Sequence, residues 1–447
     1  MLSLLCLLFI SNHKSEGVFM YKGLVGPLSV QIEITDNCNE SCGHCYRSCQ
    51  LTQNDKTVTL CPVDAITIVD RVADGGVSAV AFTGGEPLLY QKTVIPAIRR
   101  SKERGLVCNV NTNLQPLTDG VVDVFAELDV RVLTSIVSAD AFLHDAVVSL
   151  PRAHERLIRN IRKLTERGVK VSANMVVRKD NAHKVYETGI LVHSLGVRRF
   201  SATKAAPTPG INYSSYAPSR EQLKDSLDAL LRLKEELGIK VDILESYPLC
   251  FFKDLEKYKV FIRRNCTAGV FNCSISPNGD VRPCSHADMR YGNVLSESLG
   301  VCWRRMSDWR EGRYINDDCR GCPYLYECTG GCRTDAKTLT GDIRGKDPLM
   351  GRWEDIIPSP PKEDAFVELP ERMHLDVRTF LRKESFGGII KLDDDIVFLS
   401  QEASSIVVHL RVVGKFTLDD LSGFPVPEGE KEALIALLFE KGMIVAE

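Results

Sequence analysis

Short apolar segments alternate with amphipathic ones along the first half of the chain. Alternating or β-branched residues predict strands at residues 28–34, 79–82, 107–111, 129–136, 169–176 and 200–203. Apolar residues at helical spacing predict helices at residues 63–75, 93–104, 120–128, 152–167 and 185–195. This alternation implies a parallel sheet with right-handed crossovers, so we predict an α/β fold with six βα units.

The pattern changes after a loop rich in Pro and Gly at residues 204–219 and a helix at 221–237. We predict five segments: an N-terminal extension at 1–25, an α/β domain at 26–240, a Cys-rich domain at 241–345, a Pro-containing linker at 346–365 and a small α+β domain at 366–447. The last segment predicts strands at 387–392 and 395–399, a helix at 404–411, a turn at 418–421 and a helix at 430–441 that ends at Gly442.

The N-terminus does not predict a targeting or membrane segment. Residues 1–10 are apolar, but no basic region precedes them and they are too few to cross a bilayer. Met20 is an alternative start, directly before the first strand, and a cleaved signal peptide is the competing interpretation. We therefore leave residues 1–19 out of the fold argument.

Composition narrows the class of protein. The 447 residues carry a formal net charge of −3, which argues against nucleic acid as the main partner. The 16 cysteines cluster at metal-like spacings, which favours metal binding over disulfides in a chain of this length. Thiols that bind metal must stay reduced, so we expect a cytoplasmic protein without a membrane partner.

The first cysteine motif is C-x3-C-x2-C, formed by Cys38, Cys42 and Cys45. Three thiolates at this spacing fit three corners of a [4Fe–4S] cluster and leave one iron open to chelate a substrate or cofactor. The alternative is a structural zinc knuckle, with Cys49 as the fourth ligand that zinc prefers.

A second motif, Gly84-Gly85-Glu86-Pro87, follows the second predicted strand. Alone it predicts only a turn, in which glycines let a backbone approach a ligand closely and Pro87 fixes the exit of the chain. In combination with the cysteine motif, it resembles the radical S-adenosylmethionine (SAM) superfamily. The resemblance implies a partial (β/α)6 barrel whose site lies at the carboxyl ends of the strands.

The resemblance also assigns roles to residues. Cys38, Cys42 and Cys45 would hold the cluster, SAM would occupy the open iron, and the G-G-E-P segment would contact the SAM amino group. Polar residues stand near the strand positions where the family contacts SAM: Asn113, Ser138 and Asn174. For each of these three, a polar residue at a turn or strand end is an equal alternative. His144 and Asp145 are interpreted as helix-cap residues rather than catalysts, and no catalytic side chain is assigned.

A second cysteine field begins at Cys266. A C-x12-G-x4-C pattern is followed by C-x2-C-x5-C-x3-C, with these members: Cys266, Cys273, Gly279, Cys284, Cys319, Cys322, Cys328 and Cys332. An N-G turn signal at residues 278–279 predicts a hairpin between 274–276 and 280–282. The field resembles the SPASM extension, the auxiliary-cluster domain of radical SAM enzymes that act on peptides and proteins.

By that resemblance, one auxiliary [4Fe–4S] cluster would be held by Cys266, Cys273, Cys284 and Cys332. Cys319, Cys322 and Cys328 would hold three corners of a second. A zinc ribbon built from the last four cysteines is the alternative. The last cysteine of the family is missing, since no cysteine follows Cys332. The fourth ligand is therefore left open between Cys302, Asp335 and a vacant corner.

Residues 366–447 resemble the small winged-helix peptide-recognition domain associated with the PQQ-pathway radical SAM enzyme. Such domains add a leader-peptide strand to a sheet edge. A dimerisation or packing domain is an equal alternative. Nucleic-acid binding is less favoured, because Arg411 and Lys415 do not form a basic stripe.

Together these resemblances imply a radical SAM/SPASM oxidoreductase that cleaves SAM to methionine and a 5′-deoxyadenosyl radical. The radical would take a hydrogen from a peptide or protein substrate, the auxiliary clusters would accept the surplus electron or bind substrate, and a crosslink or oxidised residue would result. Ferredoxin or flavodoxin would supply the electron.

Three other functions remain open. One is a sulfatase-type maturase, although Ser285 stands where that group has Asp. Another is an enzyme of haem or tungsten-cofactor biosynthesis, and the third is an iron–sulfur electron carrier.

Overall fold

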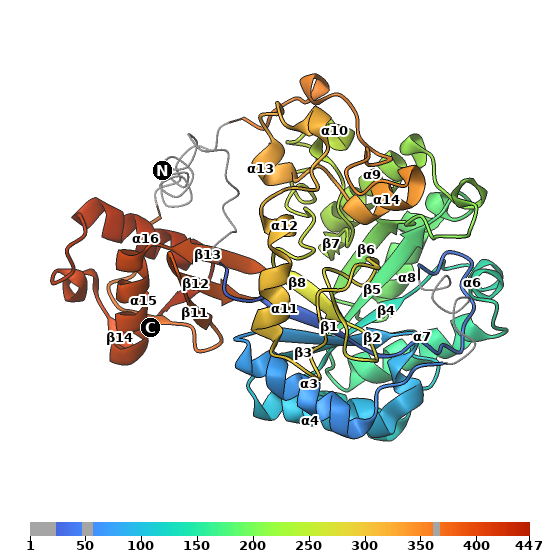
Figure 1. Ribbon diagram of the computed structural model, residues 1–447, viewed down its shortest axis with the longest axis horizontal. Helices are drawn as coiled ribbons and strands as arrows, with labels where there is room; N and C mark the ends of the chain where they lie inside the picture. Colours follow the sequence, from blue (N-terminus) through green and yellow to red (C-terminus); the bar gives the residue numbers. More distant parts are fainter. Residues whose placement is uncertain (1–23, 47–56, 361–366) are drawn as a thin grey trace. The chain divides into compact units, whose positions relative to one another are not determined.

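The computed structural model describes residues 24–46, 57–360 and 367–447 (Figure 1). These residues form two compact units: residues 26–359, and residues 367–447 together with Leu24 and Val25. Residues 1–19, Met20 and Cys49, discussed above, lie outside the described part. No helix in the described part is long and apolar enough to cross a membrane.

The larger unit is built on one nine-stranded sheet. Its order is β7-β6-β5-β4-β3-β2-β1-β8-β9, and the strands from β7 through β8 pair in parallel. The first seven are β1(Ser29–Thr35), β2(Ala79–Gly84), β3(Val107–Thr112), β4(Arg131–Ser135), β5(Val171–Val177), β6(Arg199–Lys204) and β7(Lys240–Asp242). The six predicted strands and the α/β class are confirmed. The sequence missed β7 because three residues are too few to show an alternation.

Helices cover this sheet, and all of them except α6(Ala141–Val148) follow the order that the alternation predicts (Figure 1). The others are α3(Pro62–Asp74), α4(Gln91–Glu103), α5(Asp119–Glu127), α7(Ala153–Glu166), α8(Val185–Ser194) and α9(Arg220–Leu237). In α3, Ala65, Ile68, Val69 and Val72 recur at helical spacing and are buried. The apolar face of each such helix is therefore what attaches it to the sheet.

Helix α6 was not predicted, and it corrects one interpretation. Asp140 caps its start, accepting hydrogen bonds from the backbone N–H groups of Phe142 and Leu143. His144 lies inside the helix, 1% exposed, where its Nδ1 accepts from the backbone N–H of Val137. His144 is therefore a buried residue and not a cap. Asp145 does act as a cap, because it accepts from two backbone N–H groups at the start of α7.

The Cys-rich part extends the same sheet. β8(Asn272–Ile275) pairs in parallel with β1, and β9(Val281–Arg282) pairs antiparallel with β8, so the predicted hairpin is confirmed. Arg282 donates to Glu33 of β1 at 2.5 Å, and both side chains are buried. This ion pair ties the hairpin to the first strand of the barrel.

Short helices follow in the Cys-rich part: α10(Leu249–Phe252), α11(Leu299–Arg305), α12(Ser307–Arg310), α13(Leu325–Cys328) and α14(Arg333–Thr340). Three of them contain a cysteine: Cys250 in α10, Cys302 in α11 and Cys328 in α13. Single 3-10 turns complete this unit: η1(Pro87–Tyr90), η2(Ala182–Lys184), η3(Tyr213–Ser215), η4(Asp317–Cys319) and η5(Trp353–Asp355).

The smaller unit contains two three-stranded antiparallel sheets, ordered β11-β12-β13 and β14-β10-β15. Its elements are β10(Met373–Leu375), β11(Phe380–Glu384), β12(Gly387–Leu392), β13(Asp395–Leu399), α15(Gln401–Val413), β14(Lys415–Phe416), η6(Leu418–Leu421), α16(Glu428–Glu440) and β15(Ile444–Ala446). Both predicted strands and both predicted helices are confirmed. The sheets and helices share one core, to which Ile390, Ile406, Leu410 and Leu438 belong.

Candidate active site and metal centres

The first cysteine motif lies in the loop that leaves the carboxyl end of β1. Backbone N–H groups of Ser41 and Gly43 donate to the carbonyls of Val148 and Val147, which anchors this loop to the end of α6. Its three thiols lie near one another. Burial raises the pKa of Cys38 to about 12, and Cys45 adds to the rise. Burial also raises the pKa of Cys42, with Glu40 and both other thiols contributing.

The G-G-E-P segment packs its backbone against this loop. Gly84 has φ +134°, and a Cβ there would lie 2.3 Å from the carbonyl oxygen of Thr35. A Cβ on Gly85 would lie 1.9 Å from the carbonyl oxygen of Asn37. The N–H groups of Gly85 and Glu86 donate to those two carbonyls at 2.6 and 2.8 Å. Both glycines are therefore required for the loop to approach the end of β2.

The side chain of Glu86 connects the ends of β2 and β3. Its carboxylate accepts from Thr112 Oγ1 at 2.7 Å, from the Asn113 N–H at 2.7 Å and from the Leu88 N–H at 2.9 Å. Burial raises its pKa to about 7, although these hydrogen bonds act in the opposite direction. Pro87 begins the 3-10 turn η1 that follows. The Glu86 carboxylate therefore holds the backbone at Leu88 and Asn113 in place.

The structure brings one of the three predicted polar contacts to the cysteine loop. Asn113 Nδ2 donates to Asn39 Oδ1 at 2.9 Å and to the Cys38 sulfur at 3.8 Å. Ser138 is buried in the turn before α6, where its Oγ accepts from the Asp140 N–H. Asn174 lies on β5 and accepts from Thr203 Oγ1 at 2.7 Å. A role for Asn113, Ser138 and Asn174 in binding SAM stays a prediction.

The residue that follows the third cysteine of the loop connects the loop to the Cys-rich part. Tyr46 stacks on His286, with ring centroids 3.9 Å apart and an interplanar angle of 18°. His286 comes two residues after Cys284. Burial and the nearby Arg178 together lower the pKa of His44 to about 4, so His44 is neutral at physiological pH.

Three cysteines of the first predicted auxiliary set gather beside this stack. Burial raises the pKa of Cys284 to about 12, with Cys266 adding to the rise. Burial also raises the pKa of Cys332, where Asp335 and Cys266 contribute. Cys273 is buried on β8. Burial raises the pKa of its thiol, and the neighbouring thiol of Cys302 in α11 adds to the rise. The structure therefore brings Cys266, Cys284 and Cys332 together and places Cys273 beside Cys302.

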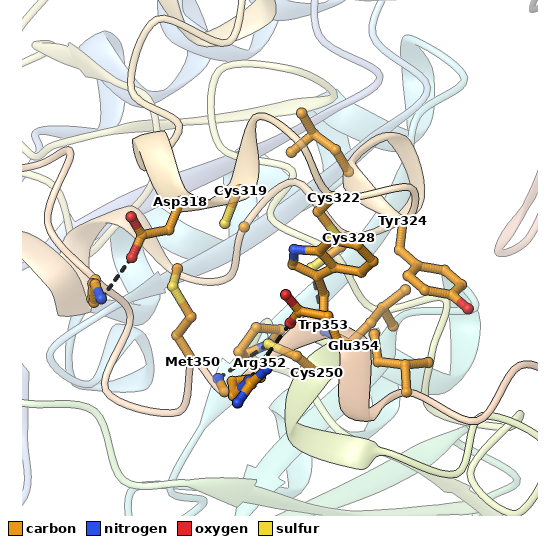
Figure 2. Close-up of a pocket in the computed structure, with 17 residues that line it drawn as sticks. Cys250, Asp318, Cys319, Cys322, Tyr324, Cys328, Met350, Arg352, Trp353 and Glu354 are labelled. Carbon is orange, nitrogen blue, oxygen red and sulfur yellow. Dashed lines mark hydrogen bonds and ion pairs between the residues drawn. The ribbon is translucent and has the colours of Figure 1, made fainter.

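The second predicted set lines a pocket of about 440 Å³ (Figure 2). Cys319, Cys322 and Cys328 all contribute to its wall. A cysteine that the motif analysis left out, Cys250 of α10, lines the same pocket. The sequence could not have identified Cys250 as a ligand, because it lies before Cys266 and belongs to no cysteine motif of known spacing.

These thiol groups fit iron–sulfur clusters. Among the described residues, no three His, Cys, Asp or Glu side chains converge closely enough to hold a single metal ion. A [4Fe–4S] cluster binds each thiolate through a different iron, so its ligands do not need to converge on one point. The first loop offers three thiols, and the glycine backbone beside it leaves no space for side chains.

Comparisons with known proteins agree with this arrangement. Residues 32–189 match the model of the Radical SAM superfamily, and residues 266–323 match that of SPASM, an iron–sulfur cluster-binding domain. The chain is a radical SAM enzyme with a SPASM domain, and it uses a SAM-binding [4Fe–4S] cluster and auxiliary iron–sulfur clusters.

Individual relatives extend over most of the chain. An AdoMet-dependent heme synthase of Nitratidesulfovibrio vulgaris is 25% identical over 334 residues, covering 71% of this chain and 90% of that protein. A PqqA peptide cyclase of Methylorubrum extorquens is 25% identical over 381 residues, covering 79% and 93%. Among solved structures, Streptococcus suis SuiB bound to the precursor peptide SuiA aligns with a TM-score of 0.58 at 19% identity, covering 76% of this chain and 79% of SuiB.

Proposed function

We propose that the enzyme modifies a peptide or protein substrate by radical hydrogen abstraction, forming a crosslink or an oxidised residue. SAM bound at the first cluster supplies a 5′-deoxyadenosyl radical for such chemistry. The chain itself holds the cluster loop in place through Asn113 and through the backbone of Gly85 and Glu86. These contacts fix the reacting groups on the rigid carboxyl edge of a parallel sheet.

The observation that carries a peptide substrate is the fold of the C-terminal unit. Its sheet β11-β12-β13 has β11 and β13 at its edges, and an extended peptide can add to such an edge by backbone hydrogen bonds. Two relatives support the same class of substrate, since one is named for cyclising the peptide PqqA and the other was solved with a precursor peptide. We assign leader-peptide capture to residues 366–447.

Small-molecule cofactor synthesis is the second candidate, favoured by the similarity to the heme synthase. A small substrate would give no role to a separate peptide-binding unit. A sulfatase-type maturase remains less favoured, because Ser285 replaces the expected Asp. We also propose ferredoxin or flavodoxin as the electron donor, and a reducing cytoplasm as the location, because clusters of this kind are sensitive to oxidation.

The test needs a precursor peptide as the probe, and a search of the short reading frames beside the gene supplies the candidates. The full chain and a variant that lacks residues 366–447 are compared for peptide affinity, product formation and SAM cleavage without peptide. We expect the deletion to weaken peptide binding at least tenfold and to leave basal SAM cleavage unchanged. Equal affinity and equal product yield in both proteins would reject peptide capture by this unit.

A further inference from the structure

Four thiols, rather than three, surround the pocket beside the second auxiliary set. Figure 2 shows Cys250 on one side of the pocket, facing Cys319, Cys322 and Cys328. All four are free in the structure. The pocket has a volume of about 440 Å³, which gives a multi-iron group room to lie among the four thiols.

The backbone around Cys250 is arranged as it would be around a cluster ligand. The Gly351 N–H donates to the Cys250 sulfur at 3.2 Å, and the Leu249 N–H donates to the Cys328 sulfur at 3.2 Å. Hydrogen bonds of this kind stabilise thiolates and tune a cluster. The segment that carries Cys250 therefore also supports the sulfur of another cysteine of the set.

Packing holds Cys250 at this position. Its neighbours in α10, Leu249, Phe251 and Phe252, are buried in an aromatic cluster with Tyr247. On the other side, the Ile357 N–H donates to the Lys253 carbonyl at 2.8 Å, which fixes the segment that follows Gly351. The placement of Cys250 is therefore set by the fold and not by a mobile loop.

The two other protein candidates for the missing ligand have different partners. Asp335 forms an ion pair with Lys204 in which both side chains are 1% exposed. Cys302 is buried in α11, where its thiol lies 3.5 Å from Glu297 Oε1. Neither is among the described residues that line the pocket.

We propose that Cys250 is the fourth thiolate of the second auxiliary cluster, together with Cys319, Cys322 and Cys328. This fourth ligand precedes the Cys-rich motifs in the sequence, whereas the last cysteine of the family pattern follows them. The downstream segment still contributes, because Gly351 donates its N–H to the Cys250 sulfur. The cluster is then closed, with no iron open to substrate, and serves electron transfer.

The first test counts irons in a background that lacks the SAM-binding cluster, the Cys38→Ala/Cys42→Ala/Cys45→Ala protein. Three variants are made in this background, each with one further substitution: Cys250→Ala, Cys319→Ala or, as a buried-cysteine control, Cys302→Ala. Each protein is reconstituted with iron and sulfide under anaerobic conditions. We expect Cys250→Ala and Cys319→Ala each to lower the iron content, by between about one iron and the roughly four irons of a whole [4Fe–4S] cluster. Both should alter the same component of the Mössbauer spectrum. Cys302→Ala should leave the iron content and the spectrum unchanged.

An unaltered iron content and spectrum in Cys250→Ala, with Cys319→Ala affected, would overturn the proposal. So would zinc in place of iron in the anaerobically purified protein. Cys250→Ser guards against a folding defect, since it keeps the size of the side chain. It should retain the fold by circular dichroism while shifting the same Mössbauer component.

A second test leaves the chain unaltered. Thiols are alkylated anaerobically with the clusters loaded and after iron is stripped with a chelator, and each cysteine is quantified by mass spectrometry. We expect the stripped-to-loaded labelling ratio of Cys250 to rise at least tenfold, in parallel with that of Cys319. A ratio near one for Cys250, with a large ratio for Cys319, would show that Cys250 does not bind the cluster.

Discussion

Lys204 of β6 and Asp335 of α14 form an ion pair inside the larger unit, with both side chains 1% exposed. Burial alone would lower the pKa of Lys204, but Asp335, with smaller contributions from Asp347 and other nearby negative groups, raises that pKa well above its usual range. Asp335 follows Cys332 by three residues, and its backbone N–H donates to the Cys332 sulfur at 3.5 Å. The pair therefore joins the barrel to the helix that begins at a predicted cluster ligand.

The first prediction concerns this pair. Lys204→Met or Asp335→Leu alone should lower the free energy of unfolding by roughly 3–5 kcal/mol, because each leaves a buried charge without its partner. The double variant should lose less than the two single variants together, since neither partner of the pair is left alone. Chemical denaturation under anaerobic conditions measures all three, as a double-mutant cycle.

The exposed pair Arg232–Glu236, joined at 2.7 Å, provides the control. Its coupling should be far smaller than that of Lys204 and Asp335, because water screens exposed helix pairs. If the double variant at Lys204 and Asp335 lost as much stability as the two single variants added together, the two side chains would not be coupled.

The second prediction separates the two cysteine fields. The Cys38→Ala/Cys42→Ala/Cys45→Ala protein should fold and still bind iron through its auxiliary cysteines, but it should no longer cleave SAM. The reason is that the three thiols lie in one loop after β1, apart from the thiols of the Cys-rich part. Iron analysis and 5′-deoxyadenosine quantification test it, and continued 5′-deoxyadenosine production would refute the assignment.

Local motifs predicted the parts of the site that lie close together in the sequence. The spacing of Cys38, Cys42 and Cys45 fits one loop, and the G-G-E-P glycines predicted a close backbone approach that the structure shows. Alternation also located β12 and β13 at their observed ends. Each of these features depends on neighbouring residues, which a single sequence displays directly.

Contacts between distant segments could not be predicted in the same way. Cys250 belongs to no motif, and only the fold of α10 brings it to the pocket with Cys319. The sequence offered Asp335 as a ligand because a carboxylate oxygen can bind iron. Its burial against Lys204 depends on how β6 packs against α14, which the sequence does not display. The short strands β7 and β10 have three residues each, which is too few for an alternation.

The third prediction tests the close approach at Gly85. Gly85→Ala would place a Cβ 1.9 Å from the carbonyl oxygen of Asn37, where backbone rather than a flexible side chain must move. The cysteine loop should shift, so SAM cleavage should fall at least 100-fold while the auxiliary iron is retained. Iron content and 5′-deoxyadenosine yield measure the two effects separately.

Gly120→Ala is the matched control for that variant. Gly120 lies in α5, and a Cβ there meets no atom within 4 Å. It should leave SAM cleavage unchanged and raise stability by up to about 1 kcal/mol, because alanine favours helix. Wild-type cleavage by Gly85→Ala would show that the loop accommodates a side chain at this point.

The fourth prediction concerns pH. Burial, helped by the nearby His154 and opposed by Asp145, lowers the pKa of His144 to about 4. As pH falls below about 6.5, the unfolded chain takes up a proton that the folded chain resists, so the unfolded state gains stability. This contribution is complete above pH 6.5 and is lost towards pH 4, by up to about 3 kcal/mol.

His144→Leu removes that proton-binding site and leaves His154 and Asp145 in place. The variant should be less stable at neutral pH, because the Val137 N–H loses its acceptor, a bond of 3.2 Å in the structure. Its stability should nevertheless fall less steeply than that of the wild type between pH 6.5 and 4.5. Taking the difference between the two proteins at each pH cancels the acid sensitivity of the clusters, which both share. Parallel curves over this window would mean that His144 titrates alike in the folded and unfolded chains.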